Sequence, residues 1–136
     1  MNRRESREQA FLFLFEKTFK DETIDEIMDA AGMARDIEIS EFAERIFNGI
    51  NENHDKIEEI IEENIKGSWK KERLSRVSLS LLRLSIYEML CEKNIPYGVS
   101  INEAVELAKK YSTKEDASFI NGVLGTVSKK LGEEDA

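Results

Sequence analysis

The spacing of apolar residues predicts helices along almost the whole chain. Near its start, Phe11, Phe15 and Phe19 recur every four positions, which places their side chains on one face of a helix. The alternating Phe and Leu of this segment would also fit a strand, but the flanking Glu and Lys favour a helix. Apolar residues in segments 42–65 and 120–131 recur at similar spacing, so these segments are predicted to be helical as well.

The segment 74–91 is apolar on almost every side, as expected for a helix surrounded by other helices. We predict that it forms the centre of the fold. It must end before Pro96, because proline donates no backbone hydrogen bond and disfavours helical geometry at the residue before it. Gly32 is predicted to end an earlier, short helix, and residues 51–53 mark a break in the long helical segment around them.

Three helix starts are indicated by capping residues. Thr23 with Glu26, and Ser100 with Glu103, match the capping box, in which a hydroxyl and a carboxylate satisfy amides that have no partner within the helix. Thr113 is placed to cap the last helix.

Length and composition predict one compact all-α domain over residues 1–136. A chain of 136 residues has the usual size of a single domain, and its 40% hydrophobic residues suffice for one core. One proline and seven glycines are too few for the many turns of an all-β fold.

The single cysteine and the short apolar runs narrow the protein class. Cys91 has no second thiol to pair with, which excludes a disulfide within the chain and a zinc cluster of cysteines. The longest apolar run, residues 10–15, falls far short of the roughly 20 residues that span a bilayer. No signal peptide is recognised, so we expect a cytoplasmic protein with no membrane partner.

Charge is unevenly distributed along the chain. The net charge of −8 argues against a nucleic-acid partner, because phosphate contacts need Lys and Arg. Residues 52–63, however, carry six acids against one lysine, whereas residues 66–76 carry five bases against one acid. A basic surface on an acidic protein is therefore compatible with this sequence.

Three arginines at the start of the chain form a second basic group. On a helix, Arg3, Arg4 and Arg7 project from one side, near the stripe that continues as Phe11 and Phe15. Single-stranded RNA binds to this combination, because Arg pairs with phosphate and bases stack on aromatic or guanidinium planes. Arginines at a helix N-terminus oppose the helix macrodipole, so helix stability gives little reason to place them there. The residues alone leave RNA binding and a solubilising basic end equally open.

Catalytic, metal and cofactor chemistry find little support. His54, the only histidine, lies among acidic residues without a nearby nucleophile. Gly122 and Gly125 lie in a predicted helix without the strand that precedes a phosphate-binding loop, and we expect them to permit close approach of a neighbouring element. We therefore expect a protein that is not an enzyme and that binds no cofactor or metal.

The sequence resembles the NusB transcription antitermination factors. The opening RRESREQA at 3–10 is similar to the arginine-rich first helix of that family, and LRLSIYEM at 82–89 to its central helix. The most specific likeness is IPYGVSINEAVELAKKY at 95–111, followed by FINGVL at 119–124.

The resemblance implies a fold and a function. The fold would have about seven helices in two packed subdomains. Proteins of this family pair with the ribosomal protein NusE, and the pair binds the boxA element of ribosomal RNA leaders. This complex joins RNA polymerase in an antitermination complex that suppresses premature termination.

The resemblance also implies the RNA-binding residues. By position, Arg3, Arg4 and Arg7 match the family's RNA-contacting arginines, and Phe15 stands where relatives often have tyrosine, with the loss of a hydroxyl donor. Phe119 and the preceding Glu115 and Asp116 match a further part of that site. Core packing remains the alternative for both phenylalanines. Asn121 lies opposite the inner face of its helix and is predicted to be polar surface or a contact.

Two other functions remain alternatives. NusB-like domains also occur fused ahead of ribosomal RNA methyltransferases, so an accessory domain of an RNA-modifying enzyme is one of them. The other is a purely protein-binding helical module, which would use the acidic surface of 52–63 or the apolar helix of 79–90. A homodimer that buries the three arginines is a further hypothesis.

Overall fold

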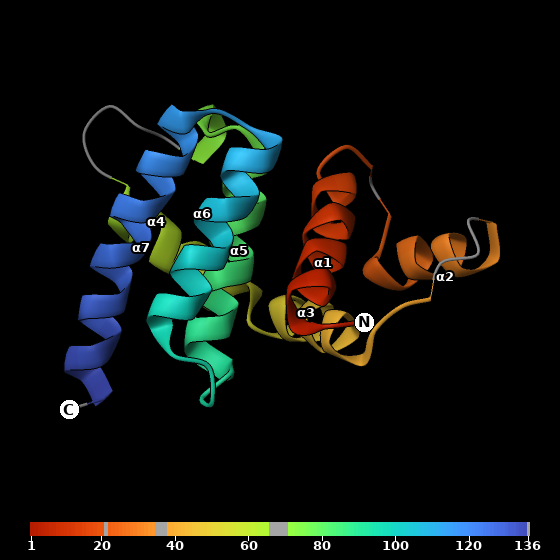
Figure 1. The fold of residues 1–136 in the computed structure, drawn as a ribbon, viewed down its shortest axis with the longest axis horizontal. Coiled ribbons are helices and arrows are strands. Elements are labelled where there is room, and N and C mark those ends of the chain that lie inside the picture. The colour runs from red at the N-terminus through yellow and green to blue at the C-terminus, as the bar shows by residue number, and fades with distance from the viewer. Residues whose placement is uncertain (21, 35–37, 66–70, 136) are drawn as a thin grey trace.

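The described chain is entirely helical. The computed structural model describes residues 1–20, 22–34, 38–65 and 71–135, and in these ranges it contains seven α-helices, one short 3-10 helix and no strand (Figure 1). The α-helices are α1 (Arg3–Lys17), α2 (Ile24–Ala34), α3 (Glu41–Glu52), α4 (His54–Asn64), α5 (Arg76–Cys91), α6 (Tyr97–Tyr111) and α7 (Lys114–Asp135). The 3-10 helix η1 spans Lys71–Arg73. The all-α prediction is confirmed.

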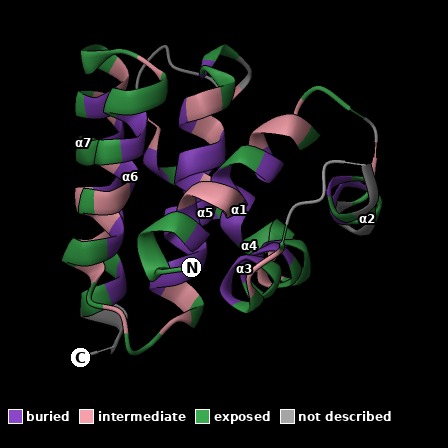
Figure 2. Ribbon diagram, turned by 45° about the vertical axis from the view of Figure 1, so that its right-hand side comes forward, coloured by how far each residue is buried: buried purple, intermediate pink, exposed green. Residues whose placement is uncertain are grey.

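The helices form two packed groups around α5. One group holds α1, α2 and α3, and the other holds α4, α6 and α7 beside α5 (Figure 1). The central helix packs against α1, α3, α4, α6 and α7, so it joins the groups into one core. Buried residues lie on the helix faces turned toward neighbouring helices, and exposed residues lie on the faces turned outward (Figure 2). The predicted central helix and the two subdomains are confirmed.

Capping side chains set several helix starts. Asn2 accepts a hydrogen bond from the backbone amide of Glu5 at 2.8 Å, which starts α1. Thr23 and Thr113 accept from amides three residues ahead, as predicted. The break at 51–53 is also confirmed, because Asn53 lies between α3 and α4.

Other sequence predictions about glycines and caps are wrong. Gly32 lies within α2 and does not end it. Ser100 does not begin a helix, because α6 starts at Tyr97 behind Pro96, whose φ of −59° already suits a helix start. A Cβ at Gly122 or Gly125 would meet nothing within 4 Å, so neither glycine provides a close approach.

The one glycine among these helices that is required by packing is Gly49 of α3. A Cβ there would lie 2.9 Å or less from three ring atoms of Tyr87, on α5. The Tyr87 hydroxyl donates to Glu92 at 2.7 Å, which fixes the ring in place. Gly49 therefore sets how closely α3 and α5 approach.

None of the helices in the described ranges is both long enough and apolar enough to cross a membrane.

Candidate nucleic-acid interface

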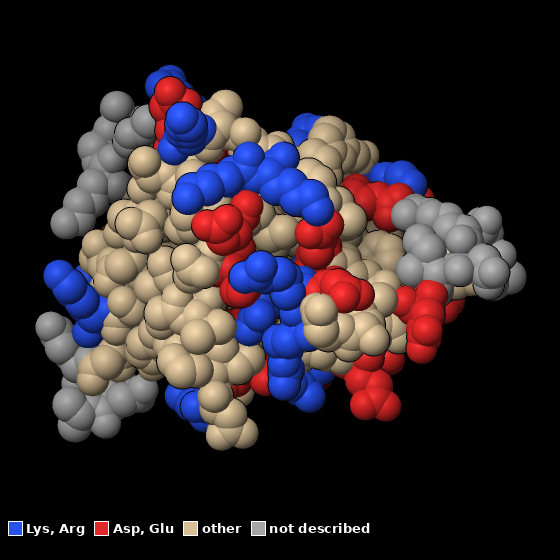
Figure 3. Space-filling model, viewed as in Figure 1, with Lys and Arg blue, Asp and Glu red and all other residues tan. Residues whose placement is uncertain are grey.

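The three N-terminal arginines lie on the first two turns of α1 but point into different surroundings. Arg3 and Arg4 are exposed, whereas Arg7 is buried. Basic side chains gather on the face where α1 and α6 lie, with acidic side chains between them (Figure 3). The prediction that all three arginines project together is wrong.

Arg7 belongs to the core. Its side chain is 4% exposed and that of Glu88, on α5, is 0% exposed. Nε of Arg7 donates to both carboxylate oxygens of Glu88, at 2.9 and 3.0 Å, and Ser100 of α6 donates to the same carboxylate at 3.4 Å. Burial raises the pKa of Glu88, against the opposing effect of Arg7. Arg7 therefore joins α1 to the central helix and is not available to a ligand, which corrects its assignment to the RNA site.

Arg4 lies at one end of a polar seam between α1 and α6. It donates to Glu103 of α6, with Nη2 of Arg4 at 3.1 Å from Oε1, and its side chain remains 68% exposed. Further along the seam, Lys110 donates to Glu8 at 2.8 Å and the Tyr111 hydroxyl donates to Glu8 at 2.9 Å. The hydrogen bond from Lys110 holds the pKa of Glu8 below its usual value. These pairs fix α1 against α6 and leave Arg4 open to solvent.

Glu103 was predicted to be a capping residue. Because α6 starts at Tyr97, Glu103 lies within the helix and not at its start. Its carboxylate pairs with Arg4. We name the surface formed by Arg4, Glu8, Glu103, Lys110 and Tyr111 the α1–α6 seam.

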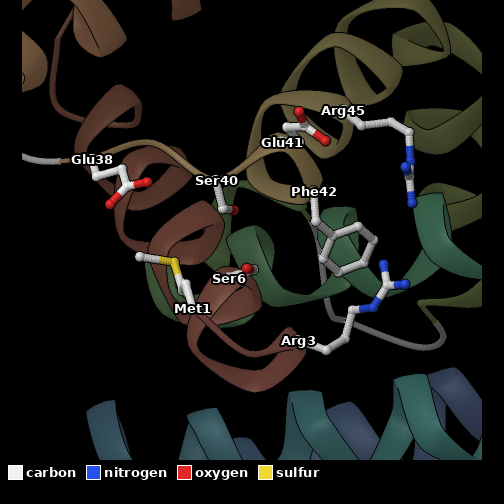
Figure 4. Close-up of a pocket in the computed structure, with 8 residues that line it drawn as sticks. All are labelled: Met1, Arg3, Ser6, Glu38, Ser40, Glu41, Phe42 and Arg45. Carbon is white, nitrogen blue, oxygen red and sulfur yellow. The ribbon is translucent and has the colours of Figure 1, made fainter.

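Arg3 stacks over an aromatic ring on α3. Its Cζ lies 3.9 Å from the centroid of the Phe42 ring, and the Cζ of Arg45 lies 5.2 Å from the same centroid. Both guanidinium groups line a pocket of about 440 Å³, where they converge at the ring (Figure 4). Arg45 is paired with Glu92 at 2.9 Å, whereas no carboxylate of the described ranges pairs with Arg3. Arg3 is thus held against the ring without an ion pair of its own, although its charge also acts on Glu92.

Aromatic rings follow α1 from the core to the surface. Phe11 is fully buried, and its ring stacks on Phe15 with centroids 6.0 Å apart. Phe15 is half-buried and meets Phe19 edge-on at 5.0 Å. Phe19 is 57% exposed. Phe15 therefore packs against the core and still presents part of its ring to solvent, so a base contact at this residue stays a prediction.

The remaining predicted site residues lie at the start of α7. Glu115 and Asn121 are exposed, and Asp116 and Phe119 are half-buried. Asp116 accepts hydrogen bonds at Oδ2 from the hydroxyls of Ser75 (2.9 Å) and Ser112. Phe119 packs against the core. The carboxylate of Asp116 is thus held in a fixed orientation between α5, α6 and α7.

The predicted site residues therefore fall into separate places. Arg3 and Arg4 lie at the start of α1, Phe15 lies near its end, and the α7 residues begin another helix. Sequence reasoning missed the partners of these residues, which are Phe42, Glu103, Lys110 and Tyr111. None of them is close in sequence to the arginines, and no local pattern marks them.

His54 and the acidic side chains are the remaining candidates for catalytic or metal chemistry. His54 is exposed beside Asp55, with 3.3 Å between Nδ1 and Oδ1. Across the described ranges, no group of three or more His, Cys, Asp or Glu side chains is arranged to hold a metal ion. The exposed guanidiniums at the start of α1 and the partly exposed aromatic rings near its end are groups that suit a polyanion with stacking bases.

Comparison with known proteins gives consistent matches over most of the chain. The NusB family model matches residues 4–129. A transcription antitermination protein NusB of Clostridium botulinum (strain Kyoto / Type A2) is 46% identical, covering 92% of this chain and 98% of the relative. The NusB structure of T. maritima has a TM-score of 0.84 and 34% identity, over 95% of this chain and 92% of that one. A crystal structure of the antitermination factors NusB and NusE with double-stranded RNA has a TM-score of 0.83 and 27% identity, over 94% of this chain and 96% of that one.

Proposed function

Because this chain belongs to the NusB family, we propose that it is a transcription antitermination factor that binds boxA RNA of ribosomal RNA leaders together with the ribosomal protein NusE. The pair joins the RNA polymerase antitermination complex. The chain acts by binding and carries out no catalysis. It works in the cytoplasm, where the nascent RNA is made.

The observation that carries this proposal is the exposure of Arg3 and Arg4 at the start of α1 in a protein of net charge −8. Cations at this end of a helix oppose its macrodipole, so helix stability does not account for them. Both are held in place by other helices, Arg3 by the Phe42 ring and Arg4 by Glu103. Fixed, exposed guanidiniums are suited to pairing with RNA phosphates.

We assign base contacts to the aromatic and acidic residues of the site. Phe15 and Phe119 stack on bases with the exposed parts of their rings. Glu115 and Asp116 accept hydrogen bonds from base amino groups, and Oδ2 of Asp116 is already oriented by two serine hydroxyls. Asn121, exposed on α7, supplies a further polar contact. Arg7 is not among the contacts, because it is buried.

The relatives favour this function over the methyltransferase alternative. The curated relative from C. botulinum is matched over 98% of its length and is named an antitermination protein. A solved neighbour was crystallised as a NusB–NusE complex with double-stranded RNA. The exposed aromatic rings of this chain favour unpaired bases, so single-stranded and double-stranded boxA are separate arms of the test below.

Replacing both Arg3 and Arg4 with alanine should weaken binding of single-stranded boxA RNA to the complex with NusE by about tenfold, because two phosphate contacts are lost. The dependence of log affinity on log salt should become shallower by about one for each arginine. Fluorescence anisotropy across a salt series measures both quantities.

The matched control removes two exposed lysines elsewhere, Lys56 on α4 and Lys129 on α7. Lys56→Ala/Lys129→Ala has the same net charge as the arginine variant and should bind like the native protein. Equal losses in the two variants would show a non-specific charge effect and remove Arg3 and Arg4 from the site. Tighter binding of double-stranded boxA would overturn the assignment of stacking bases.

A further inference from the structure

We propose that Phe19 and Arg76 form a second RNA subsite, which holds one unpaired nucleobase at the end of α1 opposite Arg3 and Arg4. This inference rests on the proposed function and extends the same interface. It assigns a role to an exposed aromatic ring, and to part of the basic segment 66–76, that the interface described above leaves without one.

The two side chains form one platform from two helices. Phe19 follows the C-terminal end of α1, and Arg76 is the first residue of α5. The Cζ of Arg76 lies 4.2 Å from the centroid of the Phe19 ring. Phe15 supports the same ring edge-on at 5.0 Å. A ring held from two directions and 57% exposed loses little further freedom when a base stacks on it.

Arg76 differs from other cations along α1 and α6 because it has no carboxylate partner in the described ranges. Arg4 is paired with Glu103, Lys110 with Glu8 and Lys20 with Glu16. Within the described ranges, no carboxylate pairs with Arg76, whose guanidinium lies over the Phe19 ring. Its place at the N-terminus of α5 opposes the helix macrodipole. Helix stability therefore gives no reason for an arginine here, whereas binding of a phosphodiester does.

The other bases of the segment 66–76 differ from Arg76 in their surroundings. Lys71 is paired with Glu58 and Glu62, at 2.9 and 3.1 Å. Lys66 and Lys70 lie outside the described residues. Arg73 is exposed close to Arg76 in sequence. Arg76 is thus the described cation of this segment that meets an aromatic ring.

The platform connects parts of the interface that are distant in sequence. Ser75 directly precedes Arg76, caps α5 and donates to Asp116 at the start of α7. Phe19 is joined to Phe15 by their ring contact. Arg76 therefore contacts the aromatic residues of α1 through Phe19 and directly follows the serine that contacts Asp116 of α7, so one strand of RNA could run from one group to the other.

A groove links this platform to the first arginines. A pocket of about 830 Å³ runs beside α1, lined by Arg4 and Lys110 and by Leu12, Phe15 and Phe19. With 15 residues, α1 is about 22 Å long, which is room for several nucleotides. Three glutamates of α1 also line the groove, so we place bases against its apolar floor and phosphates at Arg4 and Arg76.

The test measures affinity of the complex with NusE for single-stranded boxA RNA, across a salt series, for three single substitutions. Phe19→Ala should weaken binding between fivefold and a hundredfold, about the effect of losing one base stack, without changing the salt dependence. Phe19→Trp should restore binding, because a larger ring also stacks. Arg76→Ala should weaken binding and make the salt dependence shallower by about one.

Lys20→Ala is the matched control, because it removes a neighbouring cation that is already paired with Glu16; it should bind like the native protein. Native-like affinity of Phe19→Ala and Arg76→Ala, while Arg3→Ala/Arg4→Ala binds weakly, would overturn the subsite and leave the proposed function standing. Loss of NusE binding instead of RNA binding would identify the platform as a protein-docking surface and would also overturn it. Failure of the native complex to bind boxA would reject the proposed function itself.

Discussion

Replacing Arg7 with alanine should lower the free energy of unfolding by about 3–5 kcal/mol, the usual cost of breaking a buried ion pair from one side. The substitution leaves the carboxylate of Glu88, which is 0% exposed, without its cation. Among the described residues, only the Ser100 hydroxyl, at 3.4 Å, would still donate to it from a side chain. Urea unfolding followed by circular dichroism measures the change.

Two comparisons separate this effect from a general loss of charge. Arg4→Ala removes an arginine from the same helix, but its pair with Glu103 is exposed on the arginine side and stability should change little. In Arg7→Met/Glu88→Leu both charges are absent, and most of the lost stability should return. If Arg7→Ala unfolds at the same urea concentration as the native protein, the ion pair of Arg7 with Glu88 does not stabilise the core as described above.

The loss in Arg7→Ala should depend on pH. Burial raises the pKa of Glu88, so the folded state binds this proton more tightly than the unfolded state does. Stability associated with the protonated form is present at low pH and is lost as pH rises through the folded-state pKa. Without Arg7, burial should raise the pKa of Glu88 further, because the cation that lowers this pKa is gone. The stability of the variant should therefore be closest to that of the native protein in acid, where Glu88 is protonated.

Replacing Gly49 with alanine should destabilise the protein by about 1–3 kcal/mol, the usual cost of overpacking a core. The new Cβ would lie against the Tyr87 ring, whose hydroxyl is bound to Glu92. The same carboxylate is held by Arg45 at 2.9 Å, so the ring cannot move without disturbing that pair. Thermal unfolding measures the shift.

A second glycine provides the control for Gly49. Gly122→Ala places a Cβ where nothing lies within 4 Å, so only helix propensity changes and stability should rise by about 0.5–1 kcal/mol. Opposite signs for two Gly→Ala changes within helices are the expected result. A stabilising Gly49→Ala would contradict the close approach of α3 and α5.

Local patterns explain which parts of the fold were predictable. The central helix was predicted from residues 74–91 and is observed over Arg76–Cys91, because its apolar residues define it without reference to distant parts of the chain. The break at Asn53 and the cap at Thr113 also depend on a few adjacent residues. The family resemblance supplied the arrangement in two groups, which no local pattern contains.

The errors arise from contacts between distant residues. Arg7 was interpreted as surface because it is an arginine near other arginines, but its partner Glu88 lies 81 positions away. A sign of its burial was present, because Arg7 is one turn before Phe11, which is fully buried. Ser100 was assigned to a cap because Ser100 and Glu103 match the local pattern of a capping box. It is buried within α6 and its hydroxyl donates to Glu88.

The candidate site was predictable in its residue types more than in its geometry. Arg3 and Arg4 are exposed and Phe15 is half-buried, so each has at least part of the exposure that an RNA contact needs. The fixed positions of Arg3 and Arg4 depend on Phe42 and Glu103, which are distant in sequence and meet them only in the folded protein, whereas the contact of Phe15 with Phe11 follows from their spacing on α1. The joining of α1, α5 and α7 through Arg76 and Ser75 likewise appears only in three dimensions.

The central claim is that this chain and NusE together recognise boxA RNA. The direct measurement is the affinity of boxA and of a shuffled RNA of equal composition for this protein alone, for NusE alone and for the pair. We predict that the pair binds boxA more tightly than either protein alone does and more tightly than it binds the shuffled RNA. Equal affinity of the pair for both RNAs, or an affinity no higher than that of NusE alone, would contradict the claim.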